Sequence, residues 1–285
     1  MAGRLEGNGA VVQRVTGAIL RALLIAGLVV VPAALVPGLS PDAQQTVALV
    51  ALFAAVLTYV EYNATAPGLI EFRDAPPFNR IRFALIAITI LALSLVERGR
   101  SDPSNFSQLV EAVGFLVGQA MDIPYSPVHM VVGMLGPSAT ESELSALRAA
   151  SGIAYLIALL ALVIFWALMR RWPNPARPFN VWINLPTFDP TSGSDIVSRL
   201  DRDARLNLAL GFLLPFLMPL LARVTLGGLD PKSLTAPHVM IWVVAAWSFL
   251  PASLLMRGIA LGRVAQMVRA KIRASETAMA DALAA

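Results

Sequence analysis

The sequence predicts an all-α fold, a polytopic membrane helical bundle of about six transmembrane helices with an external amphipathic helix and a cytoplasmic basic C-terminal helix. Three observations predict it. Apolar residues make up 57% of the 285 residues and charged residues only 14%, whereas about a quarter of a soluble domain is charged. Six apolar runs approach the length that crosses a bilayer. The middle of each run lacks Asp, Glu, Lys, Arg and His.

The runs follow one another without an internal repeat, and we expect the whole chain, residues 1–285, to form one integral membrane domain. The first run follows Arg14 and Arg21, an arrangement that also suits a signal peptide. A retained helix is favoured because Pro37 and Gly38 follow without a clear cleavage pattern of small residues. The runs cover residues 22–36, 46–60, 83–96, 153–169, 206–222 and 239–256.

Basic residues predict the orientation of the chain, because cytoplasmic flanks of membrane proteins are enriched in Lys and Arg. The connection 37–45 has neither, so we expect it outside. The connections 61–82 and 172–205 and the tail 257–285 are rich in Arg, and we expect them in the cytoplasm. Both termini are then cytoplasmic. The excess of Arg over Lys is typical of GC-rich bacterial genomes, which favours a bacterial inner membrane.

We expect the segment 97–152 on the external side. Within it, the apolar residues of 106–121 recur at helical spacing, which is typical of an amphipathic helix lying on the membrane or on other helices. The same stretch is apolar enough to compete as a seventh span, and counting it would invert everything after it. Thr140 and Glu143 form a capping-box pattern that starts a helix well before the fourth run.

The connection between the second and third runs holds the densest group of chemically capable side chains. Its charges alternate in sign, so mutual pairing neutralises most of them and favours a structural cap. The same groups suit binding of a partner or a lipid headgroup, or acid-base work. We expect Phe72 and Phe78 to anchor the loop in the headgroup layer. The charged candidates are Glu61, Glu71, Arg73, Asp74, Arg80 and Arg82.

A possible helix-break site occurs in the fifth run, where Pro215 and Pro219 follow Gly211. Each proline removes a backbone hydrogen bond and frees a carbonyl one turn earlier. Broken helices line substrate paths in transporters, but proline also kinks membrane helices for packing. The packing interpretation is favoured, because a coupled transporter usually keeps an ionisable side chain for its ion and the run has none.

Other features favour structural roles. The two histidines, His129 and His238, lack the spacing of a metal or haem site. The basic residues lie at the ends of the runs and not among aromatic side chains, so we expect no nucleic-acid partner. The chain has no cysteine and no motif for nucleotide or dinucleotide binding, so we expect no cofactor. Two glycine pairs of spacing four permit close helix packing: Gly114 with Gly118, and Gly258 with Gly262.

These patterns favour a non-catalytic inner-membrane protein, an accessory, assembly or scaffold subunit of a larger membrane complex. Its expected partners are membrane lipids and other membrane subunits or a second copy of the chain. One alternative is a facilitative channel or transporter for small solutes that uses the broken fifth run. The other is a lipid-handling enzyme centred on the connection 61–82. An enzyme is disfavoured because no nucleophile or metal motif is present.

Overall fold

The computed structural model describes residues 2–65, 68–73, 75, 77–137, 139–172, 180, 184–186, 195–225 and 231–284, and these residues form helices and turns without a strand. Shorter pieces join the long helices: α4 (Asn105–Met121), α5 (Pro127–Val132) and the 3-10 helices η1 (Gly133–Leu135) and η2 (Pro231–Thr235). The long helices are α1 (Ala2–Leu35), α2 (Pro41–Asn63), α3 (Phe78–Ser101), α6 (Glu141–Met169), α8 (Ile196–Thr225) and α9 (Pro237–Ala284).

The six long helices are each long and apolar enough to cross a membrane. Five contain a whole predicted run, and α1 contains all of the first run except Val36. The predicted all-helical architecture with six span-length helices is therefore confirmed. The helices are longer than the runs, because Ala, Arg and Glu in the flanks are good helix formers and continue the backbone ladder. As a result the tail 257–285 is no separate element, since α9 continues unbroken to Ala284.

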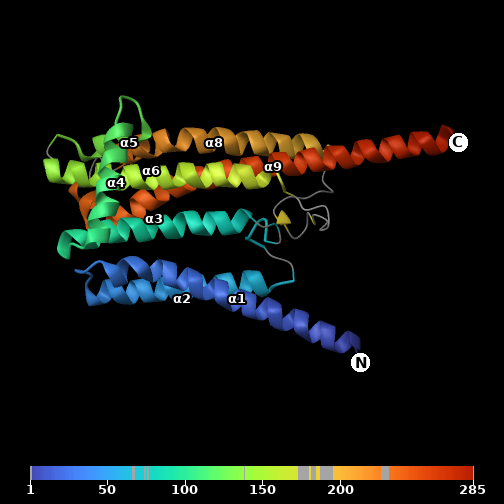
Figure 1. The fold of residues 1–285 in the computed structure, drawn as a ribbon, viewed down its shortest axis with the longest axis horizontal. Helices are drawn as coiled ribbons and strands as arrows, with labels where there is room; N and C mark the ends of the chain where they lie inside the picture. Colours follow the sequence, from blue (N-terminus) through green and yellow to red (C-terminus); the bar gives the residue numbers. More distant parts are fainter. Residues whose placement is uncertain are drawn as a thin grey trace.

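Figure 1 shows how these helices are arranged. The long helices run along one axis, and α1 and α2 form a hairpin that lies beside α3. Both termini lie at the same end of the bundle, together with the connection from α2 to α3. The last part of α9 projects well beyond the other helices at this end. The end that carries the termini therefore also carries the loop with the candidate charged residues.

The short helix α4 runs across α3 and α6 instead of along them (Figure 1). Glycine permits the close crossing, because a Cβ on Gly118 would lie 2.3 Å from the carbonyl oxygen of Arg148 in α6. A Cβ on Gly114 would lie 2.8 Å from the Ala149 carbonyl oxygen, and one on Gly152 would lie 2.4 Å from the backbone of Gly118. The close packing predicted for the first glycine pair is thus confirmed. With 17 residues, α4 is shorter than each of the six long helices, and its external position stays a prediction.

Side-chain caps fix where the helices around α4 begin. The predicted capping box at α6 is confirmed, because Thr140 accepts from the Glu143 amide while Glu143 accepts from the Thr140 amide. Ser104 and Ser107 form the same reciprocal arrangement at α4. These bonds satisfy amides that have no partner within a helix, so the sequence sets both start points locally.

A charged contact holds the end of α4 against α6. Asp122 Oδ2 accepts a hydrogen bond from Arg148 Nε at 2.8 Å, and His129 Nδ1 lies 2.7 Å from Asp122 Oδ1. Burial alone would raise the pKa of Asp122, but the hydrogen bonds from Arg148 and His129 outweigh it and hold the pKa below its ordinary value. The ionised carboxylate is therefore the form that the folded protein stabilises.

The contact predicts a pH dependence of the α4 to α6 packing. Because the pKa of Asp122 is lower in the folded state, its stabilisation is fully present above about pH 5 and is lost as pH falls through and below the ordinary Asp pKa of about 3.9. We expect Asp122→Asn to cost about 2 kcal/mol at pH 7 and to flatten this acid-side loss. Hydrogen exchange of α4 amides between pH 7 and pH 3.5 measures both effects.

A matched control is Asp102→Asn, which removes an exposed carboxylate 3.5 Å from Arg98. Such exposed pairs contribute about 0 to 1 kcal/mol, so α4 should keep its protection. Equal loss of protection in both variants would show that Asp122 does not hold α4 in place.

Candidate functional site

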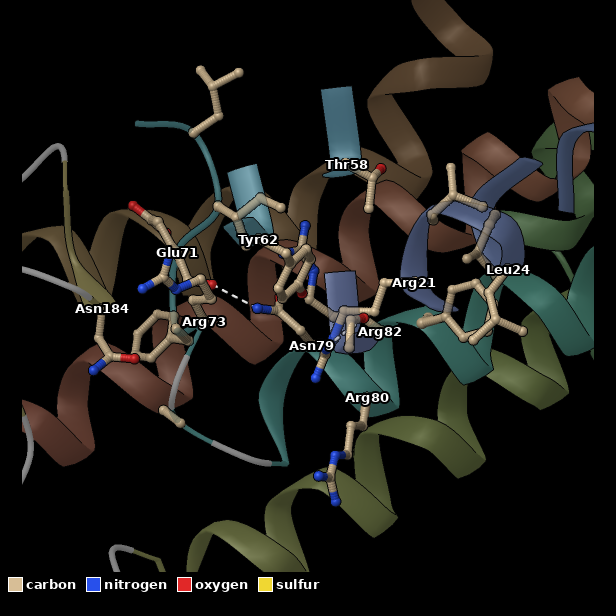
Figure 2. Close-up of a pocket in the computed structure, with 18 of the residues that line it drawn as sticks. Arg21, Leu24, Thr58, Tyr62, Glu71, Arg73, Asn79, Arg80, Arg82 and Asn184 are labelled. Carbon is tan, nitrogen blue, oxygen red and sulfur yellow. Dashed lines mark hydrogen bonds between the residues drawn. The ribbon is translucent and has the colours of Figure 1, made fainter. Parts of the chain in front are cut away.

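A cavity of about 1400 Å³ opens at the end of the bundle that carries both termini. Its walls come from α1, α2, α3 and α9, from the connection between α2 and α3, and from Trp172, Asn180 and Asn184 after α6. Figure 2 shows part of this lining. Five arginines and one glutamate line it, so formal charge within the described lining is strongly positive. The charged lining residues are Arg21, Glu71, Arg73, Arg80, Arg82 and Arg257.

The lining changes from polar to apolar with depth on three of the helices. On α3, Arg82 lies one turn nearer the open end than Ile86, and on α1 Arg21 lies one turn nearer than Ile25. On α9, Phe249 lies eight residues deeper than Arg257, which is about 12 Å along a helix. The cavity thus has a cationic mouth and an apolar interior. Deeper than the arginines the apolar lining includes Leu24, Ile25, Phe83, Ile86 and Phe249, while Leu20, Leu69, Ile70 and Phe72 line the mouth.

Glu61 organises the loop at the cavity mouth. Its carboxylate accepts hydrogen bonds from the backbone amides of Gly68, Leu69 and Ile70, at 3.1, 2.9 and 3.1 Å to one oxygen. Arg73 donates to the carbonyl oxygens of Glu61 and Ala64 at 3.2 and 2.6 Å. Backbone groups that turn in a loop need such partners when water is excluded, so Glu61 and Arg73 shape the rim.

Glu71 forms an ion pair across the cavity wall with Arg257 of α9. Arg257 Nε donates to Oε2 at 2.6 Å and its second terminal nitrogen donates to Oε1 at 2.8 Å. The Glu71 side chain is 14% exposed and the Arg257 side chain 31% exposed, so the pair is largely shielded from solvent. This two-point geometry is the strong form of an arginine to carboxylate contact. It fastens the loop to the last helix.

Arg82 brings a partly buried guanidinium to the described cavity lining. Its Nε is buried and has no hydrogen-bond partner. The guanidinium lies over the rings of Phe78 and Phe249, with its central carbon 5.1 and 5.8 Å from their centroids. It is close enough to Glu71 and Arg257 to feel their charges. Arg82 thus lines the cavity without a hydrogen-bonded carboxylate among the described residues.

Arg21 brings a second guanidinium to the cavity from α1. It stacks on Tyr62 of α2 at 4.6 Å and donates one hydrogen bond, to the carbonyl oxygen of Gly17 at 2.7 Å. Its other donors have no partner among the described residues. Arg80 also borders the cavity, but Figure 2 shows its side chain reaching away from the other labelled residues. Arg21 and Arg82 are therefore the arginines of the described lining that stack on aromatic rings and have no hydrogen-bonded carboxylate there.

The expectation that Phe72 and Phe78 anchor the loop in the headgroup layer is wrong. Both side chains are 1% exposed and their ring centroids lie 4.4 Å apart. Phe165 of α6 packs against Phe78 at 5.8 Å. The Phe72 amide bonds to the carbonyl of Asn184 at 2.7 Å and folds the loop onto the bundle. The aromatic rings thus leave the surface and form the floor of the loop.

The structure gathers four of the predicted loop residues around one cavity, namely Glu71, Arg73, Arg80 and Arg82, while Glu61 supports the rim from α2. Asp74 lies outside the described residues. Sequence reasoning missed Arg21, Tyr62, Phe249 and Arg257. The basic residues Arg21 and Arg257 were visible only as signs of membrane orientation. No periodic signal relates them to the loop, because the contacts come from different helices.

The predicted helix-break site, Gly211, Pro215 and Pro219, is buried against α9. A Cβ on Gly211 would lie 2.9 Å from the carbonyl oxygen of Pro251. Pro219 frees the carbonyl of Pro215, and the indole nitrogen of the buried Trp247 donates to that oxygen at 2.9 Å. α8 runs through both prolines as one helix, and the contact of Trp247 with the Pro215 carbonyl supports the packing interpretation.

This contact gives a testable coupling between positions 219 and 247. Trp247→Phe should cost about 1 to 2 kcal/mol, because it leaves the buried Pro215 carbonyl without a donor. In a Pro219→Ala background the new alanine amide reaches the same carbonyl, so Trp247→Phe should cost clearly less. Unfolding free energies of the four proteins in mixed micelles measure the coupling. Equal costs in both backgrounds would contradict it.

The remaining candidate residues do not converge on a metal site. His129 contacts Asp122, and His238 lines a separate apolar hollow of about 350 Å³ between α9 and the α1 to α2 hairpin. In the described ranges no three His, Asp or Glu side chains are placed to hold an ion.

Of the second predicted glycine pair, on α9, Gly258 packs tightly on α8. Gly262 makes only an ordinary van der Waals contact.

The arginine cavity is thus a site that suits binding through charge and shape. The one carboxylate of the described lining, Glu71, is paired with Arg257. The other charged groups of the lining are arginines, whose N–H donors stabilise anions. An apolar interior next to these donors favours a ligand with an anionic end and a hydrocarbon end. Comparisons of this chain with protein-family models, with curated proteins and with solved structures found no match.

Proposed function

We propose that this chain is a non-catalytic, multi-pass membrane subunit that holds an anionic lipid in its arginine cavity. The observation that carries the proposal is the change from a cationic mouth to an apolar interior along α1, α3 and α9. A lipid has the same two parts. Basic pockets between membrane helices bind anionic headgroups, and the apolar side chains of Ile86 and Phe249 keep the hydrocarbon part of the lipid in apolar surroundings.

Two features support holding a lipid over converting or transporting it. Glu71 is committed to Arg257 by two hydrogen bonds, so it is poorly placed to act as a general base. The Pro215 carbonyl, which a transporter would offer to a solute, is occupied by Trp247. A bound lipid at the junction of the α1 to α2 hairpin with α3 and α9 also suits an accessory or scaffold role, because it completes the surface that the subunit presents to partners.

The orientation that we propose places the cavity at the cytoplasmic face of a bacterial inner membrane, with both termini in the cytoplasm. The arginines at this end support it, since basic residues collect on the cytoplasmic side. We expect reporters fused after Arg171 and after Ala285 to read cytoplasmic and one inserted between residues 123 and 140 to read external. A cytoplasmic signal from the last insertion would contradict the six-span orientation.

Lipid retention tests the binding function. The protein is purified in mild detergent, and the phospholipids that remain bound are measured by mass spectrometry per mole of protein. We expect anionic lipid to be retained, and Arg82→Gln or Arg21→Gln to reduce it about tenfold, because each removes charge-assisted hydrogen bonds. Neither change breaks an ion pair among the described residues, so folding should be kept.

Arg170→Gln is the matched control. Arg170 also stacks on an aromatic ring, that of Trp166 at 3.6 Å, but it is not part of the cavity lining. Its replacement should leave lipid retention unchanged. Equal retention by Arg82→Gln, Arg21→Gln and the parent protein would reject the cavity as the lipid site.

A further inference from the structure

The charges of the cavity indicate which headgroup fits it. The groups that face the site are Arg21 from α1, Tyr62 from α2, Glu71 and Arg73 from the loop, Arg80 and Arg82 from α3, and Arg257 from α9. Glu71 neutralises Arg257, Arg73 is bonded to two backbone carbonyls, and Arg80 reaches away. Arg21 and Arg82 are then the guanidinium groups that approach the site from two directions. With five arginines against one glutamate, the positive charge of the described lining favours a dianion over a monoanion.

We propose that the lipid carries a terminal phosphate monoester, which Arg82 and Arg21 recognise; this inference rests on the proposed lipid-binding function. A phosphate monoester carries a charge of about −1.5 to −2 at pH 7 and three oxygens that accept strong hydrogen bonds. A phosphodiester headgroup carries one charge on its phosphate and has fewer free oxygens. Two arginines therefore match the monoester better than the diester.

Arg82 is suited to this recognition because its guanidinium is held in place before the ligand arrives. Phe78 and Phe249 lie against it at 5.1 and 5.8 Å, and Phe78 is itself fixed in the buried cluster with Phe72 and Phe165. A planar group that presents parallel N–H donors binds phosphate oxygens in pairs.

Arg21 approaches from the hairpin and completes the contact from a second direction. Tyr62 holds its guanidinium at 4.6 Å. Because α1 also contributes Leu24 and Ile25 one turn deeper, the same helix contacts the phosphate and the first part of the hydrocarbon chain. The inferred ligand spans the gap between the hairpin and α3, with its phosphate at the mouth.

Binding of three synthetic lipids with identical acyl chains tests the inference. Phosphatidic acid is the monoester, phosphatidylglycerol is the diester and phosphatidylcholine is the zwitterion, each measured on the full chain in nanodiscs at pH 5 and pH 7.5. The second ionisation of a phosphate monoester lies near pH 6. We expect phosphatidic acid to bind about tenfold tighter than phosphatidylglycerol at pH 7.5 and to lose most of this advantage at pH 5.

The diester is the internal control for titration of the protein, because a change in a protein group would shift both anionic lipids together. Arg82→Lys keeps the charge but not the planar pair of donors, so it should lose most of the preference for the monoester and still bind anionic lipid. Arg170→Gln should keep the preference. Circular dichroism and gel-filtration profiles check that each variant is folded.

The outcomes separate the inference from the function on which it rests. Equal affinity for phosphatidic acid and phosphatidylglycerol at both pH values would overturn the monoester and leave anionic lipid binding standing. Equal affinity for all three lipids would overturn the lipid-binding function itself. Displacement of phosphatidic acid by millimolar inorganic phosphate would show that the site takes a soluble phosphate, and would overturn the lipid as its ligand.

Discussion

Replacement of Glu71 by Gln is expected to lower the free energy of unfolding by about 3 kcal/mol, because it leaves the partly buried guanidinium of Arg257 without its carboxylate. The contact is made by two hydrogen bonds of 2.6 and 2.8 Å and joins the loop to α9. The sequence alone favours a screened cap with a cost below about 1 kcal/mol. Denaturant titration in mixed micelles measures the difference.

The double variant Glu71→Gln, Arg257→Gln tests whether the cost of Glu71→Gln comes from leaving the Arg257 charge unpaired. It should be more stable than Glu71→Gln alone, because no isolated charge remains. Asp102→Asn is the control, since Asp102 meets Arg98 at 3.5 Å on an exposed surface and should cost at most about 1 kcal/mol. A cost for Glu71→Gln no larger than that of the control would return the loop to the interpretation as a solvated cap.

Gly118→Ala is expected to destabilise the crossing of α4 on α6 by about 3 kcal/mol. The added Cβ would lie 2.3 Å from the Arg148 carbonyl oxygen and 2.8 Å from the carbonyl carbon, and both belong to the backbone of α6. Backbone atoms in a helix move only with their neighbours, so the overpacking has no cheap relief. Thermal unfolding, together with hydrogen exchange of α4 amides, reports the loss.

Gly27→Ala provides the comparison in α1, where an added Cβ meets nothing within 4 Å. There the change should stabilise the helix by about 0.5 to 1 kcal/mol, because alanine has less backbone freedom to lose. Opposite signs for the two substitutions are the expected result. A neutral Gly118→Ala would mean that α4 is not packed as closely as the structure places it.

The sequence predicted the six long helices because an apolar run of near-spanning length is a local signal that needs no partner. The glycine spacing predicted the close contact at Gly118, and the capping box predicted the start of α6. The helix ends were predicted less well. At α1 and α9 the helix continues far beyond the apolar run, because the flanking Arg, Glu and Ala residues are good helix formers. The apolar pattern alone does not show where such a helix ends.

The cavity could be predicted only in part. The loop residues Glu71 and Arg82 were visible as a charge cluster, but Glu71 pairs with a residue 186 positions later, and no periodicity links such positions. Phe72 and Phe78 were placed wrongly for the same reason. An aromatic side chain near a predicted interface is typical of a headgroup anchor, and only the fold back onto Asn184 and Phe165 makes it a core residue.

Because α9 is long, a small tilt at the cavity produces a larger displacement at the far end of the helix. Its 48 residues form one unbroken helix, and the part from Arg257 to Ala284 extends about 40 Å at 1.5 Å per residue. A tilt of about 5° at Arg257 would therefore move the far end by about 3.5 Å. A rearrangement at the cavity can thus be too small to separate Arg257 from Glu71. At the projecting end of α9 the same rearrangement is a displacement large enough to change contacts with a neighbouring molecule.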